Sequence, residues 1–143
     1  MDNFTVSMEV RWADLDPNFH VRHSVYYDWG ASARMRYLES VGLTPNVMTE
    51  AQFGPILFRE ECTFRREIRF GDIVTIDVCL LRTRADYSRW SMQHRIFRNG
   101  ELAAMLIVDG AWIDTNLRKL TIPAAVGVAA FEEMPKAEGF EIN

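Results

Sequence analysis

Apolar and polar residues alternate along the first segment of the chain, over residues 4–12. A period of two predicts a β-strand with one face in the core and the other in solvent. Between about residues 24 and 41, apolar residues instead recur at helical spacing, which predicts a long amphipathic helix. We expect Ser24 or a neighbouring residue to cap its start, and Gly42 with Pro45 to end it.

Alternation returns in the second half of the chain and predicts four further strands. These strands cover residues 56–68, 74–80, 90–96 and 102–113. The last of them is almost wholly apolar, which is typical of a strand that is buried on both faces or lies in a subunit interface. Gly71-Asp72 and Asn99-Gly100 are turn signals, and the second is typical of a tight hairpin.

The remaining segments carry weaker patterns. Residues 44–54 lack sustained periodicity and predict an irregular connection. Residues 123–133 predict a short terminal helix with Pro123 in its first turn, and the tail after it is expected to be loose. The order of elements predicts a single α+β domain over residues 1–143, with a mainly antiparallel sheet packed on one helix.

Composition narrows the classes of function. The formal net charge is -4 over 143 residues, so the chain lacks the basic field on which nucleic-acid binding depends. No apolar run reaches membrane-spanning length, and Cys62 and Cys79 both fall in strand-like runs rather than at turns. We therefore expect a cytoplasmic protein with free thiols and with no nucleic-acid or membrane partner. The three histidines and two cysteines have no metal-ligand spacing, so we expect no metal site.

The candidate chemistry lies in a polar stretch between the first strand and the long helix, residues 12–26. Its carboxylates and imidazoles face the N-terminal N–H groups and the positive dipole end of that helix, which can hold an oxyanion. Spacing alone favours a structural role for Asp16, as an Asx-turn or helix-capping carboxylate before Pro17. Asp14 is expected to be structural as well, bonded to backbone N–H groups or to Arg11.

The polar stretch and the helix after it also carry a motif. It reads Asp14-Leu15-Asp16-x-Asn18-x-His20-Val21, then Tyr26 and Ala33-Arg34. This motif resembles the hot-dog-fold acyl-CoA thioesterases, most closely the 4-hydroxybenzoyl-CoA thioesterase group, with an Asn-x-His like that of the plant acyl-ACP thioesterases. The resemblance extends over nearly the whole chain, because the later segments follow the same layout. Those segments are Gly71-Asp72, Trp112-Ile113-Asp114, Arg118-Lys119 and Pro123.

The resemblance implies a hot-dog fold, in which the sheet wraps around the long helix. It implies dimers that join two sheets edge to edge, with a homodimer as the minimal unit and a homotetramer as the expected assembly. The implied activity is hydrolysis of an acyl-CoA or acyl-carrier thioester bound across the dimer interface. CoA would enter as part of the substrate, and no separate cofactor is implied.

The resemblance also assigns residues. Asp16 takes the place of the catalytic carboxylate, as nucleophile or general base. His23 matches the position where a backbone N–H at the helix start meets the thioester carbonyl, and where some bacterial members carry a histidine. Asn18 and His20 match the acyl-ACP pair, although loop packing explains His20 equally well. Phe19 stands where a glycine is common.

Other residues are weaker candidates for binding substrate. Tyr26, Trp29 and Phe58 would line an acyl pocket, but aromatic residues at these spacings are core by default. Glu60 is either a second pocket carboxylate or, more simply, is turned to solvent by a strand bulge. Four cations in predicted turns are candidates for the CoA phosphates, although lone surface cations are usually only solvated. They are Arg82, Arg84, Arg118 and Lys119.

Two alternative functions remain open. One is a non-catalytic protein that binds acyl-CoA and keeps the fold without turnover, since a fold does not fix a function. The other is a hot-dog hydratase or dehydratase, which also handles acyl thioesters. The second is disfavoured because the polar motif precedes the helix, as it does in the thioesterases. His94, which alternates with apolar neighbours, is expected to be a core or interface histidine.

Overall fold

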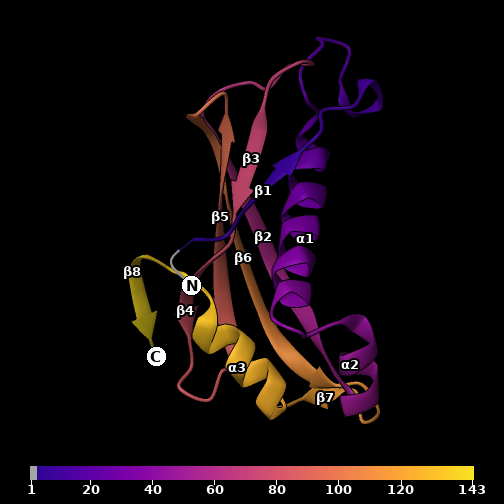
Figure 1. Cartoon of the computed structure of the whole chain (residues 1–143), viewed down its shortest axis with the longest axis vertical. Helices are drawn as coiled ribbons and strands as arrows, with labels where there is room; N and C mark the ends of the chain where they lie inside the picture. The colour runs from indigo at the N-terminus through magenta and orange to yellow at the C-terminus, as the bar shows by residue number, and fades with distance from the viewer. Residues whose placement is uncertain (1–2) are drawn as a thin grey trace.

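A computed structural model describes residues 3–143 and shows a curled sheet with a long helix against one face (Figure 1). Its elements are β1 (Thr5–Met8), the 3-10 helix η1 (Trp12–Asp14), α1 (His23–Ser40), α2 (Pro45–Ala51), β2 (Phe53–Phe64), β3 (Val74–Asp77), β4 (Cys79–Thr83), β5 (Arg89–Arg98), β6 (Glu101–Asp114), β7 (Lys119–Leu120), α3 (Ala125–Glu133) and β8 (Lys136–Ile142). The predicted α+β hot-dog architecture is therefore confirmed.

The sheet is antiparallel except at one edge. The long strand β6 pairs with β2 on one side and with β5 on the other. β5 in turn pairs with β3 and β4, and β1 pairs with β3. β8 adds a parallel strand to β4. Within residues 3–143, β2 pairs only with β6, so its other side is a free sheet edge.

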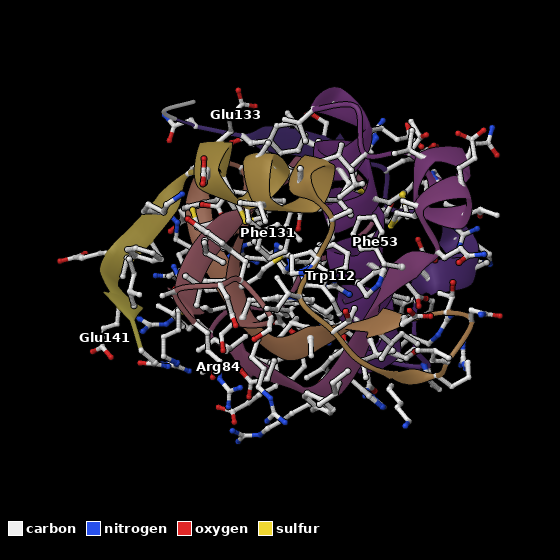
Figure 2. All side chains as sticks on the ribbon, turned by 90° about the horizontal axis from the view of Figure 1, so that it is seen from below. Phe53, Arg84, Trp112, Phe131, Glu133 and Glu141 are labelled. Atoms are coloured by element: carbon white, nitrogen blue, oxygen red, sulfur yellow. The ribbon has the colours of Figure 1, made fainter. Side chains whose placement is uncertain are left out.

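The core lies between α1 and the sheet. Burial follows the helical spacing in α1, where Val25, Ala33 and Tyr37 face inward. Burial of a side chain the size of Val25 contributes about 1.5–3 kcal/mol, and the single methyl group of Ala33 contributes less. Below the C-terminal end of α1, an aromatic cluster closes the core, and Figure 2 shows its rings beneath α3. Ring centroids lie 5.1 Å apart for Phe53 and Trp112, and 5.3 Å apart for Trp112 and Phe131.

The first strand is shorter than predicted. It ends at Met8 rather than at residue 12, and the Trp12 side chain is 70% exposed instead of facing the core. The reason is local: the Asp14 carboxylate accepts a hydrogen bond from the Arg11 backbone N–H at 2.9 Å, which closes a 3-10 turn and ends the extended backbone. The helix start also differs, because Arg22 and not Ser24 is the N-cap of α1.

Two regular elements form where none was predicted. The segment predicted to be irregular holds α2. Pro45 is the first residue of this helix, and Thr44 caps it, because Thr44 Oγ1 accepts a hydrogen bond from the Val47 N–H at 3.2 Å. The tail that was predicted to be loose forms β8, because β4 offers it a strand edge. Ala137 of β8 is buried beside Cys79 of β4.

β2 ends four residues earlier than predicted, at Phe64, although Ile68 beyond it is fully buried. Across the described part of the chain, no helix combines the length and the apolar character that a membrane crossing needs.

Candidate active site

A cavity of about 710 Å³ opens at the N-terminal end of α1. It brings together Asp16, His20 and His23 of the polar stretch, Tyr26 of α1 and Phe64 at the end of β2. The sequence predicted this grouping around Asp16 and the helix start. The remaining lining is strongly basic, because Arg65, Arg66, Arg69 and Arg98 contribute to it alongside Glu67.

Asp16 is anchored through one carboxylate oxygen. Its Oδ1 accepts hydrogen bonds from the backbone N–H groups of Asn18 at 2.9 Å and His20 at 3.1 Å. Its own N–H donates to the His20 carbonyl at 2.8 Å, and Phe19 donates back to the Asp16 carbonyl at 2.9 Å. Asp16 thus closes a tight polar loop, which is the structural role that spacing alone favoured.

The second carboxylate oxygen of Asp16 is left for other partners. No residue in the range 3–143 donates a hydrogen bond to Oδ2, and the half-buried side chain lines the cavity. The anchored Oδ1 fixes the orientation of the carboxylate, while Oδ2 can accept a proton or attack an electrophile. The structural role and the chemical role therefore coexist in one residue.

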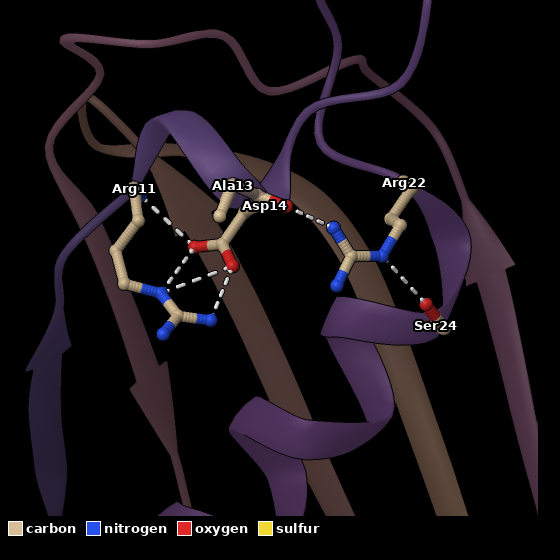
Figure 3. Close-up of polar contacts among 5 residues, drawn as sticks. All are labelled: Arg11, Ala13, Asp14, Arg22 and Ser24. Carbon is tan, nitrogen blue, oxygen red and sulfur yellow. Dashed lines mark hydrogen bonds and ion pairs between the residues drawn. The ribbon is translucent and has the colours of Figure 1, made fainter.

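The start of α1 lies beside this carboxylate. His23 is the first residue of α1, and the side chain of its N-cap Arg22 makes no capping hydrogen bond to a backbone N–H of the first turn. The Arg22 guanidinium instead donates to the Ala13 carbonyl and, at 3.2 Å, to Ser24 Oγ, which ties the polar loop to the helix (Figure 3). The first backbone N–H groups of a helix have no intrahelical acceptor. Those of His23 and Ser24 can therefore serve an anion.

Asp14 is the structural carboxylate, as predicted. Its side chain is 1% exposed, and Oδ1 accepts from Arg11 Nη2 at 2.7 Å and from Arg11 Nε at 3.1 Å (Figure 3). The hydrogen bond from the Arg11 side chain holds the pKa of Asp14 below its usual range. Its backbone carbonyl also accepts from the Arg22 N–H at 2.9 Å, so Asp14 fixes both ends of the loop.

The His20 ring is paired with an acid outside the motif. Its Nε2 lies 2.5 Å from Oε2 of Glu67, whose other carboxylate oxygen accepts from Arg69 at 3.1 Å. His20 also forms an isolated antiparallel bridge with Arg69. Asn18 is exposed and does not line the cavity, so its contribution is the backbone N–H that it gives to Asp16.

The three predicted aromatic residues have different positions. Tyr26 lines the cavity, and its ring meets that of Phe64 edge to face at 4.9 Å. Burial raises the pKa of Tyr26 to about 12, so the phenol stays neutral at physiological pH. Trp29 is buried in the core and is not part of the lining, which is the default role of such a residue. Phe58 is exposed on β2 under the guanidinium of Arg89 at 5.4 Å and does not line this cavity.

Glu60 points to solvent and does not line the cavity. The register of β2 against β6 shifts between Leu57 and Arg59, and Glu60 follows this bulge as an exposed residue. The simpler of the two expectations for Glu60 is therefore correct.

The cations predicted to meet CoA lie at the other end of the chain. Arg82 and Arg84 belong to β4 and its following loop, and Arg118 and Lys119 lie near β7, far from the start of α1 (Figure 1). They do not line this cavity, and their contact with the CoA phosphates stays a prediction.

The arginines of the cavity come instead from the segment after β2 and from the end of β5. Two of them are tied to acids: Arg66 Nε lies 3.6 Å from Glu101, and Arg69 pairs with Glu67. Arg98 Nη1 donates to the Glu67 carbonyl at 2.5 Å. The signal that was available in the sequence is the dense run of cations around the Gly71-Asp72 turn.

No cluster of three or more histidine, cysteine or acidic side chains is placed to hold a metal ion anywhere in residues 3–143. The cavity therefore offers a carboxylate, helix N–H groups, a phenol and a basic rim. These groups suit the cleavage of an anionic ester or thioester without a metal.

Solved structures with this fold include proteins bound to CoA. A Staphylococcus aureus protein in complex with CoA aligns with a TM-score of 0.84 and 19% identity, over 95% of this chain and 88% of that chain. A 1,4-dihydroxy-2-naphthoyl-CoA thioesterase from Synechocystis aligns with a TM-score of 0.81 and 20% identity, over 92% and 96%. A Thermus thermophilus thioesterase complexed with CoA and Zn is 29% identical, with a TM-score of 0.73, over 90% and 94%.

No curated protein matches the sequence. The family model of the thioesterase-like superfamily, however, matches residues 10–135, which include the polar loop, strands β2 to β7 and the helices. The chain belongs to the thioesterase-like superfamily.

Proposed function

We propose that the protein hydrolyses an acyl-CoA thioester to a free acid and CoA, with Asp16 as nucleophile or general base. The observation that carries this proposal is the state of the Asp16 carboxylate. One oxygen is fixed by two backbone N–H groups, the other accepts no hydrogen bond from the described residues, and the residue lines a cavity at the N-terminus of α1. A carboxylate that served only to close the loop would need no cavity.

The chemistry needs few groups. With Asp16 as nucleophile, Oδ2 attacks the carbonyl carbon, the C–S bond breaks, CoA leaves as a thiolate that takes a proton from solvent, and water hydrolyses the acyl-aspartyl anhydride. With Asp16 as general base, Oδ2 takes a proton from water as the water oxygen attacks the same carbon, the C–S bond breaks, and the CoA thiolate takes up the proton from Asp16 or from solvent. In both routes, negative charge develops on the carbonyl oxygen. The N–H groups of His23 and Ser24 are placed to stabilise that charge.

The basic rim supports CoA as the carrier of the acyl group. CoA carries phosphates, and Arg65, Arg66, Arg69 and Arg98 surround the cavity at its open side. Guanidinium groups suit phosphates because their planar donors bind two oxygens at once. The Staphylococcus aureus protein and the Thermus thermophilus thioesterase were both solved with CoA. An acyl-pantetheine presents the same thioester without any phosphate, so removing these arginines should lower turnover of an acyl-CoA more than turnover of the matching acyl-pantetheine.

The free edge of β2 supports a homodimer as the minimal unit. An unpaired strand edge is normally covered, and most residues of this 12-residue strand are exposed. Pairing of β2 with its copy in a second chain would join the two sheets into one. A homotetramer is the assembly we propose in solution, and light scattering on the purified protein would measure it.

Substitution of Asp16 tests the catalytic role. Asp16→Asn keeps the oxygen that accepts from the loop N–H groups and removes the charge, so we expect kcat/KM to fall by at least about 100-fold. Free-thiol release from a panel of acyl-CoAs measures this. Asp86→Asn is the matched control, because Asp86 Oδ1 accepts from the N–H two residues later at 3.0 Å, as Asp16 does, but in a distant loop.

Three outcomes separate the alternatives. Loss of activity in the Asp16 variant with a normal Asp86 variant supports the proposal. Equal turnover by all three proteins refutes the role of Asp16. Tight CoA binding by the wild type without thiol release from any thioester indicates a non-catalytic binding protein.

A further inference from the structure

A second, smaller cavity of about 170 Å³ lies under the middle of α1, between this helix, β2 and the aromatic cluster. It shares no lining residue with the cavity at the helix start. Its walls are almost wholly apolar, with Leu38, Leu57 and Met92 among them. The polar side chains in its lining are Arg34, Trp90 and Trp112.

Arg34 is a buried cation with one hydrogen-bond partner. Its side chain is 9% exposed, and its Nη1 lies 3.1 Å from Nε2 of His94. Gly30, one helical turn earlier, makes room for the guanidinium, since a Cβ there would lie 3.2 Å from Nη1. A guanidinium carries five N–H donors, and burying an unpaired charge is costly. Nε and Nη2 form no hydrogen bond with the part of the chain that the structure describes, and unlike the indole nitrogens nearby they are not fully enclosed, so a ligand can reach them.

His94 does not neutralise this charge. Arg34 can only donate, so Nε2 of His94 must be the acceptor, and Nδ1 must carry the proton that it gives to the Asp77 carbonyl at 2.8 Å. Burial, together with the charge of Arg34, lowers the pKa of His94 to about 3, so the ring is neutral.

The nearest acid acts only at a distance. Glu60 influences Arg34 through space, but its side chain is exposed on β2. Among residues 3–143, no carboxylate forms an ion pair with Arg34. The positive charge in the cavity wall therefore has no paired carboxylate among the residues that the structure describes.

The other polar groups of the lining are also donors. The indole N–H groups of Trp90 and Trp112 are buried and have no acceptor in the described range. An indole offers a donor and no acceptor. The lining contains no carboxylate, amide or hydroxyl side chain. The two indole N–H groups are fully enclosed, so Arg34 is the polar side chain of the lining that can meet an anionic oxygen in the cavity.

We propose that this cavity binds a carboxylate, with Arg34 as its counter-ion and the apolar walls around the attached alkyl chain. Its volume equals that of about six water molecules at ~30 Å³ each, which suits a short chain. The carboxylate can belong to a free fatty acid or to the distal end of a dicarboxylic acyl group. The second source rests on the proposed function, in which the thioester lies at His23. At a rise of 1.5 Å per residue, His23 and Arg34 are about 16 Å apart along α1.

Calorimetric titration with hexanoate tests the site itself. We expect wild-type protein to bind hexanoate at least tenfold more tightly than hexanamide, which has the same shape without the charge. Arg34→Met removes the cation from an apolar wall and is expected to weaken hexanoate binding at least tenfold. Equal affinity for the two probes, no binding of hexanoate to the wild type, or unchanged binding to the Arg34 variant would overturn the proposal.

A second pair of variants avoids the core. Ala31 lines the cavity from an exposed position of α1, so Ala31→Leu should obstruct the cavity and weaken hexanoate binding. Ser32→Leu adds the same side chain at the next exposed position, which is not part of the lining, and should leave binding unchanged. Binding that survives Ala31→Leu counts against the site even if Arg34→Met fails to fold. Asp16→Asn protein should bind hexanoate normally, so this result is independent of the proposed catalysis.

Turnover distinguishes the two sources of the carboxylate. The ratio of kcat/KM for sebacoyl-CoA to that for decanoyl-CoA is measured in wild-type protein and in Arg34→Met. A fall of at least tenfold in this ratio assigns the site to the distal end of the substrate. An unchanged ratio, together with lost hexanoate binding, assigns the site to a free acid.

Discussion

Asp14 and Asp16 are separated by one residue, yet they occupy opposite environments. Both oxygens of Asp14 are bonded by Arg11, and its side chain is buried. Asp16 is half-buried and lines a cavity; one of its oxygens accepts from the loop, and the other accepts no hydrogen bond from the described residues. A carboxylate whose lone pairs are fully used holds the backbone in place. A carboxylate with an unused oxygen, held by its first one, can meet a substrate.

The comparison extends to the cations that accompany the two acids. The guanidinium of Arg11 is paired with the Asp14 carboxylate, as Figure 3 shows, so its charge is already neutralised within the loop. The arginines around Asp16 are only partly engaged by Glu67 and Glu101. In the polar loop, the Arg11–Asp14 ion pair therefore fixes the backbone, whereas Asp16 and the nearby arginines line a cavity that can receive a ligand.

The largest effect on stability is expected for Asp14→Ala. This change removes the acceptor of the Arg11 N–H and of its guanidinium, so the free energy of unfolding should fall by about 2–3 kcal/mol. Urea denaturation measures it. Because the loop also carries Asp16, we expect activity to fall with stability. A variant as stable as the wild type would show that the closed pair does not hold the loop.

The acid limb of stability should also depend on Asp14. The hydrogen bond from Arg11 holds the pKa of Asp14 below the unfolded value of about 3.9, so the unfolded chain binds the proton more readily. The contribution of the ionised Asp14 to the free energy of unfolding is complete above about pH 5. It is lost as the pH falls through 4 toward the pKa of Asp14 in the folded protein. The difference in unfolding free energy between wild type and Asp14→Asn should therefore shrink below pH 4. A constant difference from pH 7 to pH 3 would contradict this.

A smaller stability effect is expected for Asp16→Asn. The amide oxygen can still accept from the N–H groups of Asn18 and His20, so the free energy of unfolding should change by less than about 1 kcal/mol. Urea denaturation alongside the activity assay measures both quantities in one protein. A loss of stability as large as that of Asp14→Ala would mean that Asp16 is a structural residue only.

The sequence predicted the elements that carry long periodic patterns. α1, β5 and β6 appear where spacing placed them, and the apolar run of β6 is indeed mostly buried. Short elements that depend on their neighbours were missed. The seven residues of α2 are too few for a periodic signal, and β8 is a strand because β4 offers it an edge.

The candidate site was predictable only where it is contiguous in the chain. Asp16, His20 and His23 lie within eight residues and do meet at one cavity. The basic rim joins residues 65–69 to Arg98, some thirty positions later, and only the sheet brings them together. Turn position suggested Arg82 and Arg118 instead, which the topology of the sheet carries to the opposite end.

The smallest expected effect concerns Phe19, in the loop that Asp16 closes. Its φ of 65° lies in the left-handed region, which costs an L-residue about 1–2 kcal/mol, whereas glycine enters it freely but loses about 0.5–1 kcal/mol of chain entropy. Phe19→Gly should therefore raise the free energy of unfolding by roughly 0.5 kcal/mol. Phe19→Ala is the matched control, because it removes the exposed ring and its contact with Trp12 but keeps the Cβ. If the glycine variant is no more stable than the alanine variant, the loop around Asp16 is not strained, and its closure by Oδ1 alone accounts for its shape.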